Sequence, residues 1–311
     1  MVQMIATRDG YGKALVELGQ KNHEVVVLDA DLAKSTKSIE FGKKFPERFW
    51  YTGISEADTI GMAAGLATCG KVAFASSFAV FITNRCYDQI RMSVAYSNTN
   101  VKIVGSHGGL LTGADGPSAQ AILDVALMRT MPNMVVTVAA DFVEAQKITH
   151  AIAEHKGPCY LRTTREPRPV IFDDSYEFRI GKGAVVVEGN DVSLIACGPI
   201  LNEAIQASAV LKKQGISASV VNMPSIKPLD EKLVVQQAKK TGRVLTIEDH
   251  VINGGLGSAV AEALGEHFPA RMQRVGVQNV FAESGSPKEL YGKYGLDAEA
   301  IVKKAKNLLR E

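Results

Sequence analysis

Apolar runs of strand length alternate with segments of helical periodicity along the sequence, and this alternation restricts the fold more than any other feature. In the first half, the strand-like runs are residues 24–30, 72–76, 101–105, 134–138 and 159–163. The helical segments around them are residues 11–20, 56–68, 85–96, 119–129 and 142–154. Because alternating strands and helices build mainly parallel sheets with helices on both faces, we predict an α/β fold.

The alternation is interrupted once and then resumes. Residues 165–174 are rich in proline and charge, which is typical of a linker. Further strands are predicted at residues 184–187, 192–196, 218–222, 243–248 and 274–277, and further helices at residues 202–214, 231–240, 257–266 and 297–309. We therefore predict two tandem domains, residues 1–166 and 183–311, joined by a linker at 167–182, each a mainly parallel sheet flanked by helices.

The composition excludes several classes of protein. The net charge is only +2, and basic residues are interleaved with acidic ones, so we expect no nucleic-acid partner. No apolar run approaches the ~20 residues of a membrane helix, and the N-terminus lacks a signal-peptide pattern. The cysteines lie far apart in apolar surroundings, at Cys69, Cys86, Cys159 and Cys197. We expect buried, reduced thiols in a cytoplasmic protein that binds no membrane.

A loop rich in small and polar residues follows the predicted strand at 101–105. It reads Ser-His-Gly-Gly-Leu-Leu-Thr-Gly-Ala-Asp-Gly-Pro-Ser over residues 106–118. Ligands of parallel α/β sheets bind outside the carboxyl ends of the strands. Glycines let a backbone approach a ligand closely, and His107 and Asp115 supply polar chemistry. We therefore predict part of an active site here.

The predicted helix at 56–68 begins with an acid and continues with small residues. Glu56 stands at the positive end of the helix dipole, and Ser55 with Asp58 forms a loose capping box, so a purely structural role is one explanation. The small residues on adjoining turns are Ala57, Gly61, Ala64 and Gly65. They let another backbone approach. The second explanation is a subunit interface that buries Glu56.

Together these segments resemble the transketolases, and more narrowly their C-terminal half, which carries a pyrimidine-binding domain and a C-terminal domain. The motifs are Gly-Ile-Ser-Glu (53–56), Phe-Ala-Val-Phe-Ile-Thr-Asn-Arg-Cys-Tyr-Asp-Gln-Ile-Arg (78–91), Gly-Ser-His (105–107) and Ala-Asp-Gly-Pro-Ser (114–118). The similarity continues through residues 226–230 and 246–257. It implies the transfer of a two-carbon ketol unit from a ketose phosphate to an aldose phosphate, with thiamine diphosphate as cofactor.

The resemblance assigns residues to the cofactor. Glu56 matches the glutamate that hydrogen-bonds N1′ of the aminopyrimidine and thereby favours the tautomer whose 4′-nitrogen removes the thiazolium C2 proton. Asp31 matches an aspartate near the cofactor. The region where the family wraps the pyrimidine corresponds to Phe78, Phe81 and Arg85. Which phenylalanine stacks on the ring stays open, and either one can instead be a core residue.

The resemblance also assigns residues to the substrate. His107 matches a histidine that contacts substrate oxygens near the reacting carbons, and Asp115 matches an aspartate that hydrogen-bonds a donor hydroxyl. Arg8, Ser35 and Arg165 match positions that bind the terminal phosphate, for which the planar guanidinium is suited. The alternative for these three is a set of solvated loop residues.

Two positions depart from the family pattern. Ala119 stands where many transketolases carry histidine or glutamine, and Gln120 follows it. Ala114 stands where a glutamate commonly precedes the aspartate. The substrate pair can therefore differ from the usual pentose phosphates.

The sequence contains no Gly-Asp-Gly triplet, the motif with which the family binds the diphosphate through a divalent metal. The resemblance therefore implies no metal ligands in this chain and an N-terminal transketolase subunit that holds Mg²⁺ or a similar ion. The implied assembly is α2β2, in which this chain associates with itself. Met1 directly precedes the first motif, which favours a naturally separate subunit, although a truncated piece of a longer chain would look similar.

Three alternatives remain. A 2-oxo-acid dehydrogenase β subunit has the same layout and cofactor glutamate, but Gly-Ser-His and Asp-Gly-Pro-Ser argue against it because they serve sugar hydroxyls. A related thiamine diphosphate synthase that acts on a non-standard sugar phosphate is the second. A catalytically silent structural or regulatory subunit is the third, and retention of Glu56, His107 and Asp115 argues against it.

Overall fold

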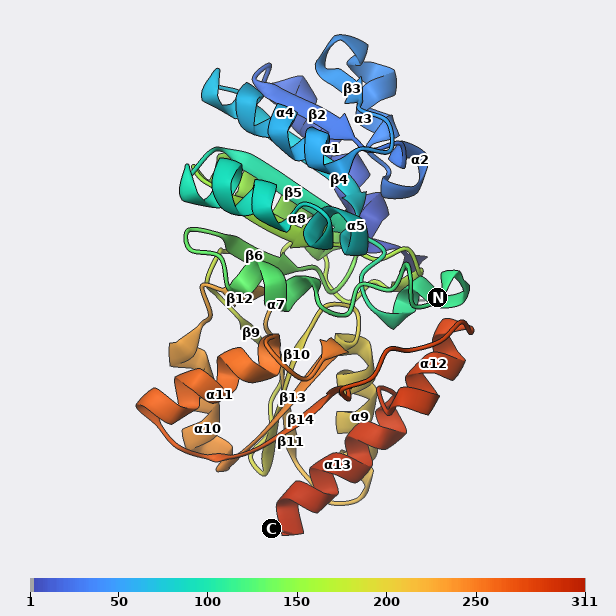
Figure 1. The fold of residues 1–311 in the computed structure, drawn as a ribbon. Coiled ribbons are helices and arrows are strands. Elements are labelled where there is room, and N and C mark those ends of the chain that lie inside the picture. Colours follow the sequence, from blue (N-terminus) through green and yellow to red (C-terminus); the bar gives the residue numbers. More distant parts are fainter. Residues whose placement is uncertain (1–2, 311) are drawn as a thin grey trace.

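The computed structural model describes residues 3–310, so Met1 lies outside the described residues. Two α/β units follow each other along the chain (Figure 1), which confirms the predicted fold class. The first is built on a seven-stranded sheet in the order β12-β6-β7-β5-β4-β2-β3. Its strands are β2 (Val25–Asp29), β3 (Phe49–Tyr51), β4 (Val72–Phe78), β5 (Val101–Ser106), β6 (Val135–Val138), β7 (Cys159–Arg162) and β12 (Ser225–Lys227). All neighbours are parallel except β12.

Both faces of this sheet are buried, which explains why its strands are continuous apolar runs. Val25 and Val27 join a core with α1 (Thr7–Lys21) and α8 (Phe142–Glu154). Val26 and Leu28 join a core with α4 (Glu56–Thr68), η2 (Ile90–Tyr96) and α7 (Asp124–Arg129) on the other face. Shorter helices complete the unit: α2 (Ala33–Thr36), α3 (Ile39–Lys44), η1 (Pro46–Arg48), α5 (Ala79–Asn84), α6 (Tyr87–Gln89) and η3 (Leu110–Asp115).

The second unit has a five-stranded sheet in the order β14-β13-β10-β11-β9. Its strands are β9 (Ala184–Val187), β10 (Val192–Cys197), β11 (Ala218–Asn222), β13 (Arg243–Val251) and β14 (Arg271–Val277). Only β9 pairs antiparallel. The helices are α9 (Leu201–Lys213), α10 (Glu231–Thr241), α11 (Leu256–His267), α12 (Pro287–Tyr294) and α13 (Ala298–Arg310). A separate pair joins β1 (Met4–Ile5) to β8 (Arg168–Pro169).

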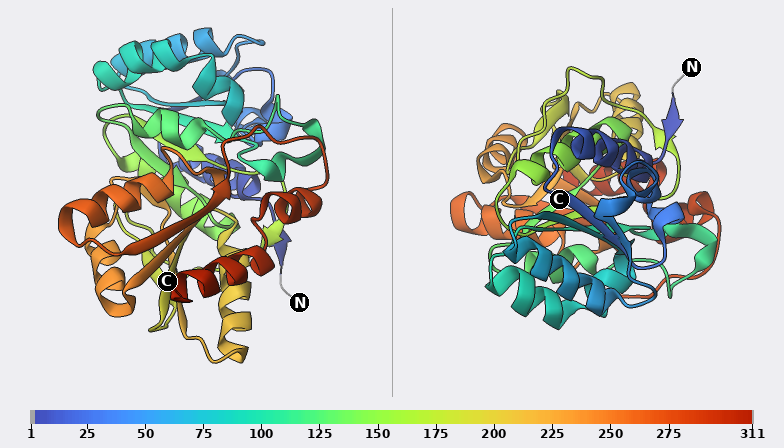
Figure 2. Two further views of the ribbon diagram at one scale, coloured as in Figure 1. Left: turned by 60° about the horizontal axis from the view of Figure 1, so that its bottom comes forward. Right: turned by 90° about the horizontal axis from the view of Figure 1, so that it is seen from above.

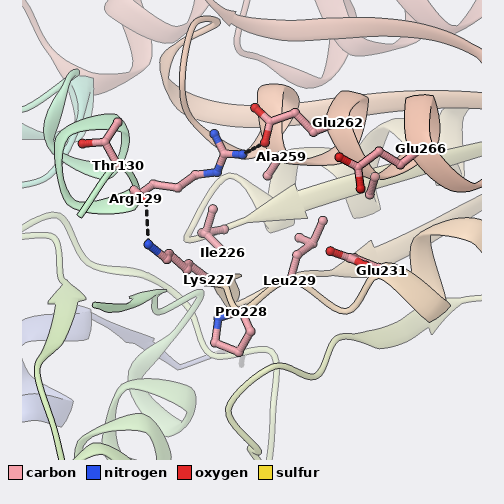
Figure 3. A pocket seen from close by; sticks show the side chains of 11 residues that line it. Arg129, Thr130, Ile226, Lys227, Pro228, Leu229, Glu231, Ala259, Glu262 and Glu266 are labelled. Atoms are coloured by element: carbon pink, nitrogen blue, oxygen red, sulfur yellow. Dashed lines mark hydrogen bonds and ion pairs between the residues drawn. The ribbon is translucent and has the colours of Figure 1, made fainter. Parts of the chain in front are cut away.

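The two units are joined by more than the connecting chain. The strand β12 comes from the second half of the sequence but pairs with β6 of the first sheet. Lys227 at its end donates hydrogen bonds to the carbonyls of Arg129 and Met131. Arg129 in turn forms an ion pair with Glu262 of α11, across a pocket of about 450 Å³ (Figure 3). The junction of the two units therefore includes polar contacts beside shared apolar cores.

Three local expectations are wrong. The helix expected at 119–129 begins at Asp124, because the N–H groups of Ala119 and Gln120 turn back to the carbonyl of Gly116. Ser55 does not cap α4, since its hydroxyl donates to the Thr52 carbonyl instead. Cys69 is exposed at the end of α4, although Cys86, Cys159 and Cys197 are buried free thiols as predicted. Within residues 3–310, no helix combines the length and apolar character needed to cross a membrane.

Candidate active site

The sheet order brings the predicted site residues to one edge of the first unit. The strands β7, β5, β4, β2 and β3 are consecutive neighbours and parallel, so their carboxyl ends meet at that edge. The residues at or beyond these ends are Asp31, Ser35, Glu56, Phe78, His107, Asp115 and Arg165. Arg8 joins them because the N-terminus of α1 lies beside the end of β7, where the Arg8 N–H donates to the Thr164 carbonyl.

Glu56 is a buried carboxylate at the first residue of α4. Its side chain is 5% exposed, and Arg85 Nη1 lies 3.2 Å from both carboxylate oxygens. The Arg85 guanidinium also lies over the ring of Phe81, 4.3 Å from its centroid. A planar group bearing N–H donors thus contacts the carboxylate and an aromatic face at the same time.

An aromatic group extends from Phe81 to His107. Phe78 is near-parallel to Phe81, with ring centroids 5.6 Å apart, and to His107, with centroids 3.7 Å apart. Both neighbours of the Phe78 ring are therefore rings of the protein itself. Phe81 contacts the Arg85 guanidinium, which in turn donates a hydrogen bond to the Glu56 carboxylate.

His107 is held neutral at neutral pH. Burial, followed by the charges of Arg8 and Arg165, lowers the pKa of its imidazole to about 3. The imidazole Nδ1 is 2.8 Å from the Ser106 hydroxyl, and the residue has a φ of +61°. Its carbonyl accepts a hydrogen bond from the Thr112 hydroxyl. The neutral ring can offer a hydrogen bond without adding positive charge beside two arginines.

The residues expected to bind phosphate form an electropositive corner. Burial lowers the pKa of the Arg8 guanidinium, and the nearby charge of Arg165 adds to that effect. Arg8 Nη1 donates to the Ser35 carbonyl at 2.9 Å, while its buried Nε has no partner among the described residues. Arg165 Nη1 lies 2.9 Å from each carboxylate oxygen of Asp115. The structure thus pairs the expected phosphate ligand with the expected sugar ligand.

Sequence reasoning missed Asp29, which shapes the loop after β2. Its buried carboxylate accepts hydrogen bonds from the Leu32 N–H and from the hydroxyls of Thr36 and Ser38. Burial raises its pKa to about 6. These bonds place exposed Asp31 (φ +61°) and Ser35 beside a pocket. The signal available was an aspartate at the carboxyl end of an apolar strand.

The two departures from the family pattern lie within the loop after β5. Ala119 is buried and adds no polar group. Gln120 does not replace it as a donor, because its amide nitrogen donates to the carbonyls of Gly113 and Glu283. Among residues 3–310 no cluster of three or more histidine, cysteine, aspartate or glutamate side chains could hold a metal ion.

Comparison with known families and proteins gives consistent matches. The profile of the transketolase pyrimidine-binding domain matches residues 3–169, and that of the transketolase C-terminal domain matches residues 181–301. A protein of Methanocaldococcus jannaschii named as a transketolase C-terminal section is 47% identical over 96% of this chain and 94% of its own length. A subunit of 6-deoxy-6-sulfo-D-fructose transketolase from Clostridium sp. strain MSTE9 is 41% identical over 96% of this chain and 92% of its own length.

The most informative structural match has a similar length to this chain. It is a solved structure described as a split-gene transketolase, an inactive β4 tetramer, with 49% identity and a TM-score of 0.93. The match covers 98% of this chain and 99% of that one.

Proposed function

The chain belongs to the transketolase family, and on that premise we propose that it is the C-terminal subunit of a split transketolase. It transfers a two-carbon ketol unit from a ketose phosphate to an aldose phosphate in complex with an N-terminal subunit. The observation that carries the proposal is the buried carboxylate of Glu56, placed beside a stacked, planar N–H donor at the strand ends.

Family membership implies dependence on thiamine diphosphate, and the residues present fit its aminopyrimidine ring. The Arg85 guanidinium already makes the two contacts that such a ring needs, an N–H bond to Glu56 and a face against Phe81. We therefore assign ring stacking to Phe81 and proton holding at N1′ to Glu56, with Phe78, Arg85 and Asp31 around the ring. The bound cofactor supplies the electron sink for carbon–carbon bond cleavage.

The remaining polar residues are assigned to the sugar phosphate. Neutral His107 hydrogen-bonds substrate oxygens near the reacting carbons, and Asp115 accepts a bond from a donor hydroxyl. Arg8, Arg165 and Ser35 bind the terminal phosphate, supported by the unpartnered Nε of Arg8 and by the Arg165 charge, which helps to lower the pKa of the Arg8 guanidinium.

The diphosphate and its Mg²⁺ are assigned to the N-terminal partner, because the 311-residue sequence has no Gly-Asp-Gly motif. Self-association within an α2β2 assembly is assigned to the outer face of α4 and η2. This face exposes Gly61 and Gly65 together with the large apolar residues Met62, Met92 and Tyr96. Exposed apolar side chains gathered on neighbouring elements favour an interface.

The donor site is proposed to lack one hydroxyl contact that many transketolases make, so the donor can differ from a common pentose phosphate. Ala119 offers no polar contact, and the amide donors of Gln120 are occupied. A relative at 41% identity is named for a sulfonated sugar, so the sugar differs among similar proteins. A place in pentose phosphate metabolism in the cytoplasm is proposed on the basis of the family and the free thiols.

The test is reconstitution. The chain is co-expressed with a polypeptide that carries Gly-Asp-Gly, and the purified complex is assayed for ketol transfer over a panel of sugar phosphates and for pyruvate decarboxylation. We expect ketol transfer in the complex and none from the chain alone. Pyruvate decarboxylation without ketol transfer would instead identify a 2-oxo-acid dehydrogenase subunit. Failure to bind any such polypeptide contradicts the split-enzyme proposal.

A further inference from the structure

The segment 107–120, here named the donor loop, is held by the C-terminal domain. Asp249 lies on β13 and is 5% exposed. Its Oδ1 accepts a hydrogen bond from the Leu110 N–H (2.9 Å) and its Oδ2 one from the Leu111 N–H (3.4 Å). The Tyr291 hydroxyl of α12 donates to the same Oδ2 at 3.1 Å. A buried carboxylate of the second unit thus binds the backbone at the start of η3 in the first.

The contact is close and lies next to a strained residue. A Cβ at Gly109 would lie 2.1 Å from Asp249 Oδ2, so only glycine fits between Asp249 and the loop. Two residues earlier, His107 has a φ of +61°, which a non-glycine residue keeps only where its surroundings enforce it. The N–H groups of Gly108 and Gly109 bind carbonyls of the first unit, and the bonds to Asp249 fix the two residues that follow. The backbone that carries His107 is therefore held in part from the second unit.

The other end of the donor loop is also bound by the C-terminal domain. The Ser284 hydroxyl donates to the Ala114 carbonyl at 2.6 Å, immediately before Asp115. The Gln120 side chain donates to the Glu283 carbonyl at 3.0 Å. Figure 2 shows the segment after β14 and the helix α12, in red, lying beside η3, in green. Both sugar-facing residues are thus flanked by contacts to the C-terminal domain.

We propose that Asp249 is a positioning residue for sugar recognition, through which the C-terminal domain sets the geometry of His107 and Asp115. The proposal rests on the proposed function, because it concerns the same sugar site. Asp249 touches neither substrate nor cofactor and acts through the amides of Leu110 and Leu111. The C-terminal domain then contributes to donor selectivity and not only to stability.

The neighbouring residue provides a matched control. Glu248 is 1% exposed on the same strand, and its carboxylate accepts hydrogen bonds from the N–H groups of Leu256 and Gly257, both at 2.8 Å. Each of the two carboxylates thus binds two backbone amides. Glu248, however, serves the start of α11 within its own domain, whereas Asp249 binds the donor loop. Glu248→Gln therefore controls for the loss of a buried carboxylate on this strand, and only Asp249→Asn releases the donor loop.

The experiment compares the two variants by hydrogen exchange of the full chain and by kinetics of the reconstituted complex. For Asp249→Asn we expect exchange at residues 108–116 to rise and kcat/KM for the donor to fall, each about tenfold, as for loss of one charge-assisted hydrogen bond. The ratio of kcat/KM between two ketose phosphates that differ at one hydroxyl should also shrink. Glu248→Gln should leave the exchange at residues 108–116, kcat/KM for the donor and the selectivity ratio unchanged. If the two variants change these three quantities equally, the proposal is overturned.

A milder variant covers the case in which Asp249→Asn does not fold. Tyr291→Phe removes one donor to the carboxylate and should change exchange and donor selectivity in the same direction, to a smaller degree. If no partner restores ketol transfer, the proposed function fails, but the hydrogen-exchange measurement remains valid. Unchanged exchange at residues 108–116 in both Asp249→Asn and Tyr291→Phe overturns the positioning role of Asp249, whatever the outcome for the proposed function.

Discussion

Arg165 binds Asp115 at two points, with its Nη1 2.9 Å from each carboxylate oxygen. The two side chains are assigned to different parts of one substrate, a phosphate and a hydroxyl. Because both side chains are more than a third exposed (38% and 35%), this ion pair adds little to the free energy of unfolding. A sugar phosphate can therefore exchange this internal pair for contacts of its own.

Arg165→Lys is expected to raise KM for a phosphorylated donor about tenfold in the reconstituted complex, because lysine loses the two-point geometry of the guanidinium. The free energy of unfolding should change by less than about 0.5 kcal/mol. Arg179→Lys is the control, since Arg179 is exposed and forms an ion pair with Glu177 outside the site. An unchanged KM for phosphorylated donors would remove Arg165 from the phosphate site.

Glu56→Gln should abolish most ketol transfer, with a loss in kcat of at least about 100-fold, because an amide cannot hold the proton assigned to this carboxyl. Asp58→Asn is the control, as Asp58 is an exposed acid in the first turn of the same helix. Steady-state kinetics of the two complexes, with melting curves to verify folding, decide the matter. Near-normal turnover of Glu56→Gln would rule out the assigned mechanism.

The neutral state of His107 predicts a pH dependence of stability. Its pKa in the folded chain is about 3, whereas an unfolded histidine titrates near ~6.5. The contribution of neutral His107 to the free energy of unfolding is thus complete above pH ~6.5. It is lost as the pH falls toward 3, by up to about 1.4 kcal/mol per pH unit. Denaturant unfolding of the parent and of His107→Asn from pH 4 to 8 measures this difference.

Asparagine is the suitable substitute because it tolerates the positive φ of His107. Other buried groups titrate in the same range, among them Glu144, whose pKa burial raises to about 7. They are common to parent and variant, so the difference between the two curves isolates His107. Parallel curves would show that the imidazole does not titrate as the structure indicates.

Much of the fold follows from sequence pattern because the strands are buried on both faces and the helices are long. The bounds of α4 and α8 agree with the predicted segments 56–68 and 142–154. Short elements escape such reasoning, since β3 and β12 have three residues each and carry no periodicity. The pairing of β12 with β6 is a tertiary event that neither strand specifies alone.

The site residues, too, divide into those that local sequence predicts and those that only tertiary structure reveals. Family motifs locate Glu56, His107 and Asp115 because each lies in a contiguous signature. The bond from Leu110 to Asp249 joins residues 139 positions apart, so no local pattern reports it. The stacking partner of Phe81 depends on the rotamer of Arg85, which sequence spacing does not encode.

The outer face of α4 is assigned to self-association, and two glycine substitutions can distinguish such an interface from ordinary surface. A Cβ at Gly65 would meet no atom within 4 Å, and the same holds for Gly265 of α11. Leucine at either position should stabilise the free chain by up to about 1 kcal/mol, because leucine favours helix more than glycine does. Only Gly65→Leu should also weaken self-association, since its side chain fills the space that a second α4 face needs. Sedimentation of both variants over a range of concentrations measures this, and an unchanged association constant for Gly65→Leu would place the interface elsewhere.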